Sequence, residues 1–242
     1  MSEHWYCAKT GEPRYTTESK KTGKIRNTTL RDAKAAPGTL VPSVSTINSM
    51  LSKSGLDTWK QTQVLYAAVE YPRWEGENEK DWVSRILELA KAKSKEAAER
   101  GTAIHDILDS YFSFDYVPEW PGYVHNIRQL LDETFGNRLW ISEKSFAHPE
   151  GYGGKCDLYS KADPVRNLPG VVIDFKTTEK DPGELTPYYE YTMQLAAYRE
   201  ALAPDAVCAN IFVNGDTHEI SLKIHAEQDI KDAYEAFLCL LK

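Results

Sequence analysis

A carboxylate and an amine interrupt an apolar segment in the second half of the chain. The segment Val171–Thr177 carries Asp174 and Lys176 among mostly apolar residues. A strand alternates its faces, so these two side chains are expected on one face, with Ile173 and Phe175 on the other. Charged groups of both signs are unusual on a strand that otherwise reads as core. Taken alone, such a pair is more often a surface salt bridge at a strand end.

A second acid, Asp157, follows Gly153 and Gly154, which we interpret as a turn that leads into a strand. An aspartate on a hairpin is common by itself. The preceding strand carries Glu143 and is expected to pair with the strand of Asp157. Several acids on adjacent strands repel one another unless a cation lies between them. Oxygen ligands of this kind suit a hard ion such as Mg²⁺.

Two further candidate groups lie on predicted helices. His105 follows Gly101 by four residues and lies at the edge of an apolar helical stripe. A lone helical histidine is usually structural or solvated. Tyr191, Gln194 and Tyr198 share one helix face at steps of three and four. Alone, they are more typical of an amphipathic helix whose tyrosine packs on a sheet.

The elements that position these residues change in kind along the chain. We expect a basic, irregular arm over 1–40, a mainly helical part over 41–135 that includes the His105 helix, and an α/β core over 136–242, with one catalytic domain spanning about 79–242. The expected elements are a helix over 79–114 that Gly101 either breaks or allows to pack closely, a helix over 124–135, strands over 139–147, 155–161 and 171–177, a helix over 187–202, strands over 207–213 and 219–225, and a helix from 226. This order predicts an α/β fold with a central mixed β-sheet flanked by helices, preceded by an N-terminal helical region.

The formal net charge of −7 does not suggest a nucleic-acid binder. The charge is uneven, however, because residues 1–34 hold eight Lys or Arg against four acids. A second basic group precedes His105 and consists of Lys91, Lys93, Lys95 and Arg100. Cationic segments on an acidic body are compatible with DNA contact. A solvated tail and an ordinary charged helix face explain each group equally well.

Cysteine spacing and hydropathy set further expectations. The four cysteines lie far apart without a Cys-x-x-Cys pair, which argues against a zinc site and gives no disulfide framework. The apolar runs are too short to span a bilayer, and no secretory signal is evident. We therefore expect no membrane partner and a cytoplasmic protein.

Taken together and in order, four elements are much more specific: Gly-x-x-x-His at 101–105, Gly-x-x-Asp at 154–157, Asp-x-Lys at 174–176 and Gln-x-x-x-Tyr at 194–198. They resemble the RecB-like branch of the PD-(D/E)XK nuclease superfamily, which includes lambda-type exonucleases, mitochondrial genome maintenance exonucleases and many phage proteins. The resemblance extends from Gly101 to Tyr198, and the stretch from Pro42 to Lys60 is similar to the N-terminal part of phage members. It implies a restriction-endonuclease-like core.

The resemblance also implies a metal centre that holds one or two Mg²⁺ or Mn²⁺ ions. Asp157 and Asp174 would be the main ligands, together with the backbone carbonyl of Phe175. His105 would complete the shell of one ion, and Glu143 would bind through water or a second ion. Some relatives hold an iron–sulfur cluster with four cysteines, three of them closely spaced. This chain has no such trio, so we expect no cluster.

The same resemblance assigns roles to the remaining motif residues. Lys176 would hold or deprotonate the attacking water, and Gln194 and Tyr198 would orient the scissile strand. The expected DNA contacts come from Lys91, Lys95, Arg100, Tyr191, Gln194 and Tyr198.

The leading hypothesis is a DNA exonuclease that acts in recombination, repair or phage replication, in the cytoplasm of a bacterium or a phage-infected host. The resemblance implies that its products carry a 5′-phosphate. The enzyme would prefer ends or single strands and could work with a recombination or single-strand-binding protein. Two alternatives stay open at this point. One is a structure-specific or single-strand endonuclease with the same site, and the other is a non-catalytic DNA-binding module on a nuclease fold. The motifs do not indicate polarity or oligomeric state.

Overall fold

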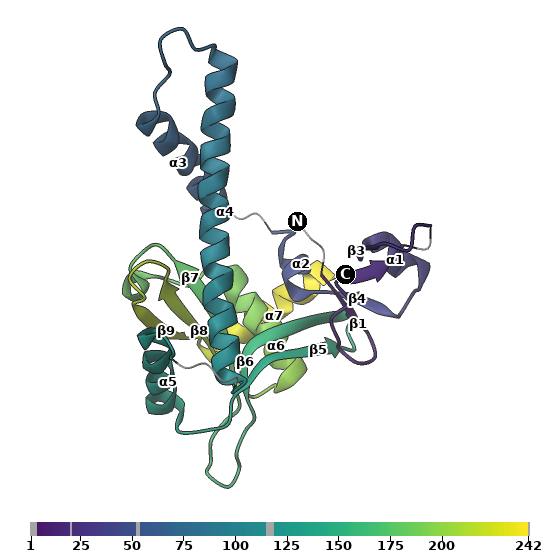
Figure 1. Ribbon diagram of the computed structural model, residues 1–242. Coiled ribbons are helices and arrows are strands. Elements are labelled where there is room, and N and C mark those ends of the chain that lie inside the picture. Colours follow the sequence, from purple (N-terminus) through teal and green to yellow (C-terminus); the bar gives the residue numbers. More distant parts are fainter. Residues whose placement is uncertain (1–3, 20, 52–53, 115–118, 242) are drawn as a thin grey trace. The chain divides into compact units, whose positions relative to one another are not determined.

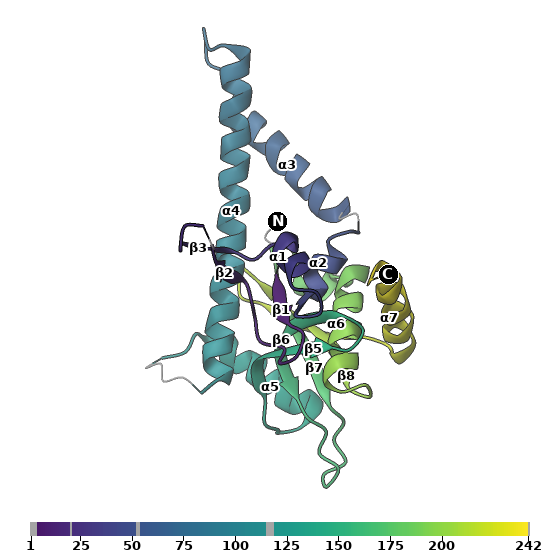
Figure 2. The ribbon, with the colours of Figure 1, turned by 90° about the vertical axis from the view of Figure 1, so that its right-hand side faces the viewer.

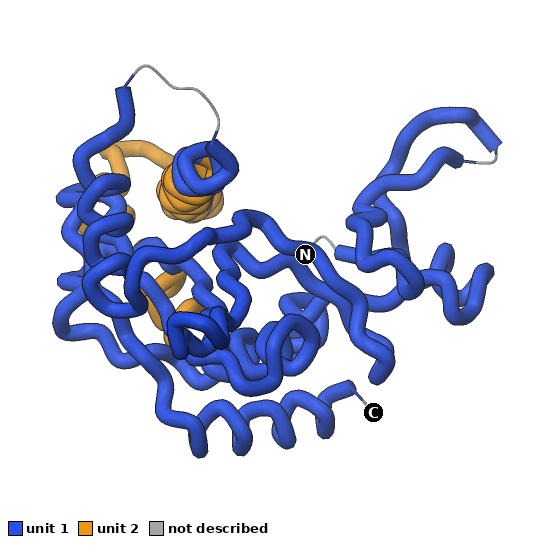
Figure 3. The backbone as a smooth tube through the Cα atoms, turned by 90° about the horizontal axis from the view of Figure 1, so that it is seen from below, with its two compact units in different colours: residues 1–51, 107–242 blue, residues 52–106 orange. Residues whose placement is uncertain are grey.

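The computed structural model describes residues 4–19, 21–51, 54–114 and 119–241. They form two compact units, one of residues 1–51 and 107–242 and the other of residues 52–106 (Figure 3). The long helix α4 (Glu79–Phe112) contributes its last six residues to the first unit. Within the described residues, no helix is both long and apolar enough to cross a membrane.

The larger unit is built on a five-stranded mixed sheet in the order β5-β6-β7-β8-β9 (Figure 1). The strands are β5 (Ile141–His148), β6 (Tyr152–Ser160), β7 (Val171–Thr178), β8 (Val207–Asn214) and β9 (Ile220–Ile224). β7 and β8 run parallel, and the other neighbours are antiparallel. The parallel pair requires a crossover, which helix α6 (Tyr189–Leu202) supplies. The predicted α/β class, with a mixed sheet flanked by helices, is confirmed.

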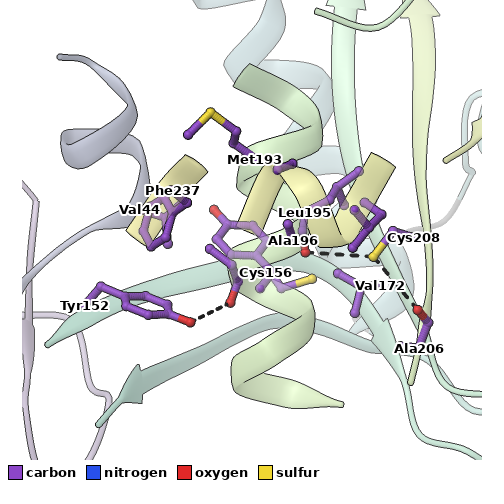
Figure 4. Packing of buried hydrophobic residues seen from close by; sticks show 14 of the residues in the cluster. Val44, Tyr152, Cys156, Val172, Met193, Leu195, Ala196, Ala206, Cys208 and Phe237 are labelled. Carbon is purple, nitrogen blue, oxygen red and sulfur yellow. Dashed lines mark hydrogen bonds between the residues drawn. The ribbon is translucent and has the colours of Figure 1, made fainter. Parts of the chain in front are cut away.

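One face of the sheet packs against α6, which in turn contacts α2 (Val44–Asn48) and α7 (Glu227–Leu241) (Figures 1 and 2). Figure 4 shows the shared core of this face, where buried side chains from strands and helices meet: Val44, Cys156, Val172, Leu195 and Phe237. Burying a side chain such as that of Phe237, which is 0% exposed, stabilises the fold by roughly 1.5–3 kcal/mol. This packing fixes α6 against the strands that carry the two candidate aspartates.

The other face of the sheet carries Phe175, whose ring stacks on Phe112 at the end of α4, with centroids 6.5 Å apart. Helix α5 (Gly122–Phe135) contacts β9 and buries Val124, Ile127 and Leu131 completely, at the three- and four-residue steps of an amphipathic helix. Asp174 and Lys176 therefore share the α6 face, while their neighbour Phe175 packs on the opposite face, as the alternation predicts.

The two glycines before Asp157 do not form the turn that we expected. The chain reverses at Gly151, which has a φ of 94°, and Gly153 and Gly154 lie inside β6. A Cβ atom at Gly154 would come within 2.8 Å of the Phe146 ring and 2.9 Å of the Tyr198 ring. The glycine is needed because α6 and β5 press aromatic rings onto this strand, a long-range contact that local sequence does not reveal.

The N-terminal stretch, expected to be irregular, contains short paired strands. β1 (Trp5–Cys7) pairs with β4 (Leu40–Pro42), and β2 (Thr16–Glu18) pairs with β3 (Ile25–Asn27). The helix α1 (Leu30–Ala35) follows β3 in the chain and precedes β4. Strands of three residues are too short to show a period, so no hydrophobic pattern predicts them. Residues 1–3 and 20 of the expected arm lie outside the described residues.

The smaller unit consists of α3 (Ser54–Glu70) and the first part of α4. Ala67 of α3 packs with Ile86 and Ala90 of α4, and these three form the buried centre of the unit. The helix α4 runs through Gly101 without a break, so the first of the two interpretations of that glycine, a break into two helices, is wrong.

We expect Gly154→Ala to destabilise the protein by about 1–3 kcal/mol, because the added methyl group overpacks the space between two aromatic rings. Urea unfolding followed by circular dichroism measures this. Gly122→Ala is the matched control, since a Cβ atom there meets nothing within 4 Å. Equal stability of the two variants would contradict the close approach of Tyr198 to β6.

Candidate active site

The two candidate aspartates lie opposite each other where two strands separate. The ladder between β6 and β7 ends at the pair Leu158–Ile173, so Asp157 and Asp174 are the next positions on each strand. Asp157 Oδ2 accepts the backbone N–H of Phe175 at 2.8 Å. A side-chain carboxylate thus takes the place of a ladder hydrogen bond, which satisfies a backbone donor at this position.

Asp174 is buried and paired with a cation. It is 1% exposed, and its Oδ2 lies 2.7 Å from the Lys176 Nζ atom. Lys176 Nζ also donates to Gln194 Oε1 at 3.1 Å, and Gln194 Nε2 donates to the Tyr198 hydroxyl at 2.8 Å. The structure therefore brings four of the predicted site residues into one connected group that links β7 to α6.

The electrostatics of this group keep Lys176 charged. Burial alone lowers the pKa of Lys176, but the nearby carboxylates of Asp174 and Asp157 outweigh it and raise the pKa above its ordinary value. The ammonium group also lies 4.8 Å from the centre of the Tyr191 ring, a cation–π contact. Burial, followed by the charges of Asp174 and Asp157, raises the pKa of Tyr198 well above its ordinary value, so its hydroxyl stays protonated.

Glu143 lies opposite Asp157 in the register of β5 and β6, between the pairs Ser142–Leu158 and Lys144–Cys156. Its φ of 52° is in the left-handed region, which costs a non-glycine residue of order 1–3 kcal/mol and is often found at functional sites. Its carboxylate forms an ion pair with Lys155. The sequence placed Glu143 beside Asp157 but missed Lys155 as its partner.

Asn210 is a site residue that the sequence analysis missed. It faces Asp174 across the parallel register of β7 and β8, is completely buried, and donates from Nδ2 to Asp174 Oδ2 at 2.9 Å. A signal was present, because Asn210 interrupts an otherwise apolar segment, as Asp174 does. Buried polar side chains need partners, so a buried asparagine beside a buried carboxylate is informative.

The remaining predicted residues lie on α4 in the unit of residues 52–106: Lys91, Lys95, Arg100 and His105. Lys95 is exposed and lies 3.5 Å from Glu99 in an ion pair one helical turn away. The approach of His105 to Asp157 and Asp174 stays a prediction, as does the path of DNA along the three basic side chains.

Asp157 and Asp174 offer the oxygen ligands that Mg²⁺ and Mn²⁺ prefer. Among the described residues, no three His, Cys, Asp or Glu side chains gather as a complete metal site. Mg²⁺ commonly takes one or two carboxylates and completes its shell with water and substrate phosphate. The pair of opposed carboxylates fits such an ion, with the Phe175 carbonyl as a further oxygen on the same strand.

Comparison with known proteins adds little to this description. No protein-family model matches the chain, and no curated protein matches it. It is similar to a solved structure described as "Crystal structure of SSO0001", with 14% sequence identity and a TM-score of 0.31, over 77% of this chain and 87% of that chain. The role of the site is therefore inferred from its own geometry.

We expect Lys176→Met to destabilise the protein by about 3–5 kcal/mol, because it leaves the buried Asp174 carboxylate without its counter-charge. Adding Asp174→Asn to Lys176→Met should recover most of this loss, since the uncompensated charge is then gone. Thermal and urea unfolding of the two single variants and the double variant measure the coupling. Simple additivity of the two substitutions would show that the pair does not interact.

Proposed function

We propose that this protein is a divalent-metal-dependent DNA nuclease of the PD-(D/E)XK superfamily, RecB-like branch. The observation that carries the proposal is the group at the separating ends of β6 and β7, where Asp157, Asp174 and Lys176 meet. Gln194 and Tyr198 join it from the crossover helix, which fits the fourth motif. The meander β5-β6-β7 followed by a crossover to a parallel β8 fits a restriction-endonuclease-like core.

In the proposed reaction, Asp157 and Asp174 would hold the metal through their carboxylate oxygens. A bound Mg²⁺ or Mn²⁺ ion lowers the pKa of water and polarises a phosphoryl oxygen. Lys176 contributes an ammonium group, whose three N–H donors can bind a water molecule and a phosphate oxygen. An ammonium group at this position suits holding the nucleophile and stabilising the negative charge that develops in the transition state.

Gln194 and Tyr198 have different roles in the proposed site. Gln194 contacts Lys176 directly and is partly exposed, so it can orient both the lysine and the scissile strand. Tyr198 is 5% exposed and packs edge-on against Phe146, with ring centroids 5.5 Å apart. Tyr198 therefore acts through Gln194, whose amide it fixes by a hydrogen bond, and not by touching DNA.

The aromatic residues at the start of α6 fit a substrate with unpaired bases. Tyr191 packs between the Lys176 ammonium and Phe212, whereas Tyr188 and Tyr189 are 47% and 52% exposed. Exposed rings at the start of the helix that carries Gln194 can stack bases without reading sequence. This favours cleavage at ends or single strands, as in an exonuclease, with Lys91, Lys95 and Arg100 proposed to follow the phosphate backbone.

We expect Mg²⁺- or Mn²⁺-dependent release of 5′-phosphorylated products from end-labelled linear DNA. Asp174→Asn, Asp157→Asn and Lys176→Met should each lower kcat at least about a hundredfold, the scale for losing one electrostatic contact to the transition state. Asp205→Asn, which alters an exposed aspartate in the loop before β8, is the matched control and should keep normal activity.

Covalently closed circular DNA in the same time course separates the candidates. Cleavage of linear but not circular DNA supports the exonuclease, and cleavage of both identifies an endonuclease with the same site. Binding of DNA without cleavage in either metal would make the chain a binding module. Normal turnover by Asp174→Asn would overturn the assignment of the site.

Binding of single-stranded DNA in Ca²⁺, which we expect to support binding without turnover, tests whether Tyr188 and Tyr189 stack bases. Tyr188→Ala and Tyr189→Ala should together weaken binding by about 1–3 kcal/mol for each base that loses its stacking partner. Tyr71→Ala, at an exposed tyrosine in the other unit, is the control. Unchanged affinity after the double substitution would place the bases elsewhere. Fluorescence anisotropy across a salt series gives both affinities and the number of phosphate contacts.

A further inference from the structure

A hydrogen-bonded network of three polar side chains extends from the buried side of Asp174. Asn210 donates from Nδ2 to Asp174 Oδ2 at 2.9 Å and to the Asp174 carbonyl oxygen at 3.2 Å. His225, which follows β9, places its Nε2 atom 2.8 Å from Asn210 Oδ1. Its Nδ1 atom lies 3.3 Å from the Thr192 hydroxyl on α6. This network therefore joins β7, β8, the end of β9 and the crossover helix.

The carboxylate at one end sets the direction of every hydrogen bond. An ionised carboxylate only accepts, so Asn210 must present its NH₂ group to Asp174 and its oxygen to His225. An amide oxygen also only accepts, so Nε2 of His225 must carry a proton. Burial lowers the pKa of His225 against the opposing pull of Asp229 and Asp174, which favours the neutral ring. In that form Nδ1 accepts from the Thr192 hydroxyl.

The arrangement does more than satisfy buried polar atoms. Asn210 and Lys176 both approach the same atom of Asp174, Oδ2, from β8 and from β7. Within the described part of the chain, no hydrogen bond uses Oδ1, and the 2.7 Å approach of Lys176 is to Oδ2. A carboxylate held at one oxygen from two sides presents the other in a fixed direction, with its lone pairs kept for a ligand.

We propose that Asn210, oriented by His225 and Thr192, is a positioning residue that fixes the Asp174 carboxylate for binding a divalent cation. The inference rests on the proposed metal-dependent function and extends it to residues outside the four motifs. Carboxylate ligands of metals are themselves hydrogen-bonded, and loss of such a partner typically costs 10- to 100-fold in metal affinity or activity. His225 adds a conformational lock, because its ring prevents the amide of Asn210 from turning over.

Calorimetric titration with Mn²⁺, without DNA, tests the proposal. We expect Asn210→Leu and His225→Phe to weaken Mn²⁺ binding by about 10- to 100-fold. His225→Gln should stay close to the wild type, because its amide Nε2 can donate where the ring did. Thr192→Val, which removes only the hydroxyl, should have a smaller effect than His225→Phe. His148→Phe is the matched control, since this histidine stacks on Tyr152 and does not belong to the hydrogen-bonded network.

A second readout needs no metal and no activity. Nitrogen-15 NMR of the His225 ring should show a proton on Nε2 and none on Nδ1, and Asn210→Leu should shift the Nε2 signal. A bare Nε2 in the wild type would overturn the proposed order of donors. Thermal unfolding accompanies each variant. Because His225 is partly exposed, its Phe and Gln variants carry the test if Asn210→Leu does not fold.

The outcomes separate this inference from the proposed function. If the wild type binds Mn²⁺ and both Asn210→Leu and His225→Phe bind it equally well, the positioning role is wrong and the metal site stands. If the wild type binds no Mn²⁺, the proposed function itself fails and the metal role of Asn210 fails with it. Weakened binding that His225→Gln restores supports both.

Discussion

An ionised carboxylate buried in the middle of a sheet is the constraint on which the rest of the site depends. Asp174 is 1% exposed, and removing such a charge from water costs several kcal/mol unless partners replace the water. Lys176 supplies the opposite charge and Asn210 a neutral donor, both at Oδ2. Each partner is buried or partly buried in turn and needs partners of its own. Gln194 serves Lys176, and His225 serves Asn210.

The fold around this carboxylate must keep two strands apart without leaving the backbone unsatisfied. Asp157 does this by accepting the N–H of Phe175, a backbone donor beyond the last pair of the β6–β7 ladder. Helix α6 must come close enough for Gln194 to reach Lys176. Gly154 permits that approach because Tyr198, one turn further along α6, packs where a Cβ atom would be. The local geometry and the helix packing therefore support each other.

Much of the larger unit could be predicted because its signals are local. Apolar strands and amphipathic helices gave the α/β class and the order of elements, and alternation along Val171–Thr177 placed Asp174 and Lys176 on one face. The unexpected features all depend on contacts between distant segments. The Tyr198 ring leaves no room for a Cβ atom at Gly154 of β6, and Glu143 pairs with Lys155 across the β5–β6 ladder. Asn210 interrupts an apolar segment, but only the register of β7 and β8 shows that it faces Asp174, and His225 reaches it from the end of β9. Three-residue strands such as β1 carry no period at all.

We propose that Asp157 and Asp174 bind a catalytic divalent cation. A crystal structure of the protein soaked in Mn²⁺, with anomalous scattering recorded at the manganese edge, tests this proposal most directly. We expect an anomalous peak within about 2.0–2.2 Å of oxygens from both aspartates, at the distances of small divalent ions. The same map would show directly whether His105 reaches the ion. An occupied Mn²⁺ site elsewhere, with Asp157 and Asp174 bare, would contradict the proposal.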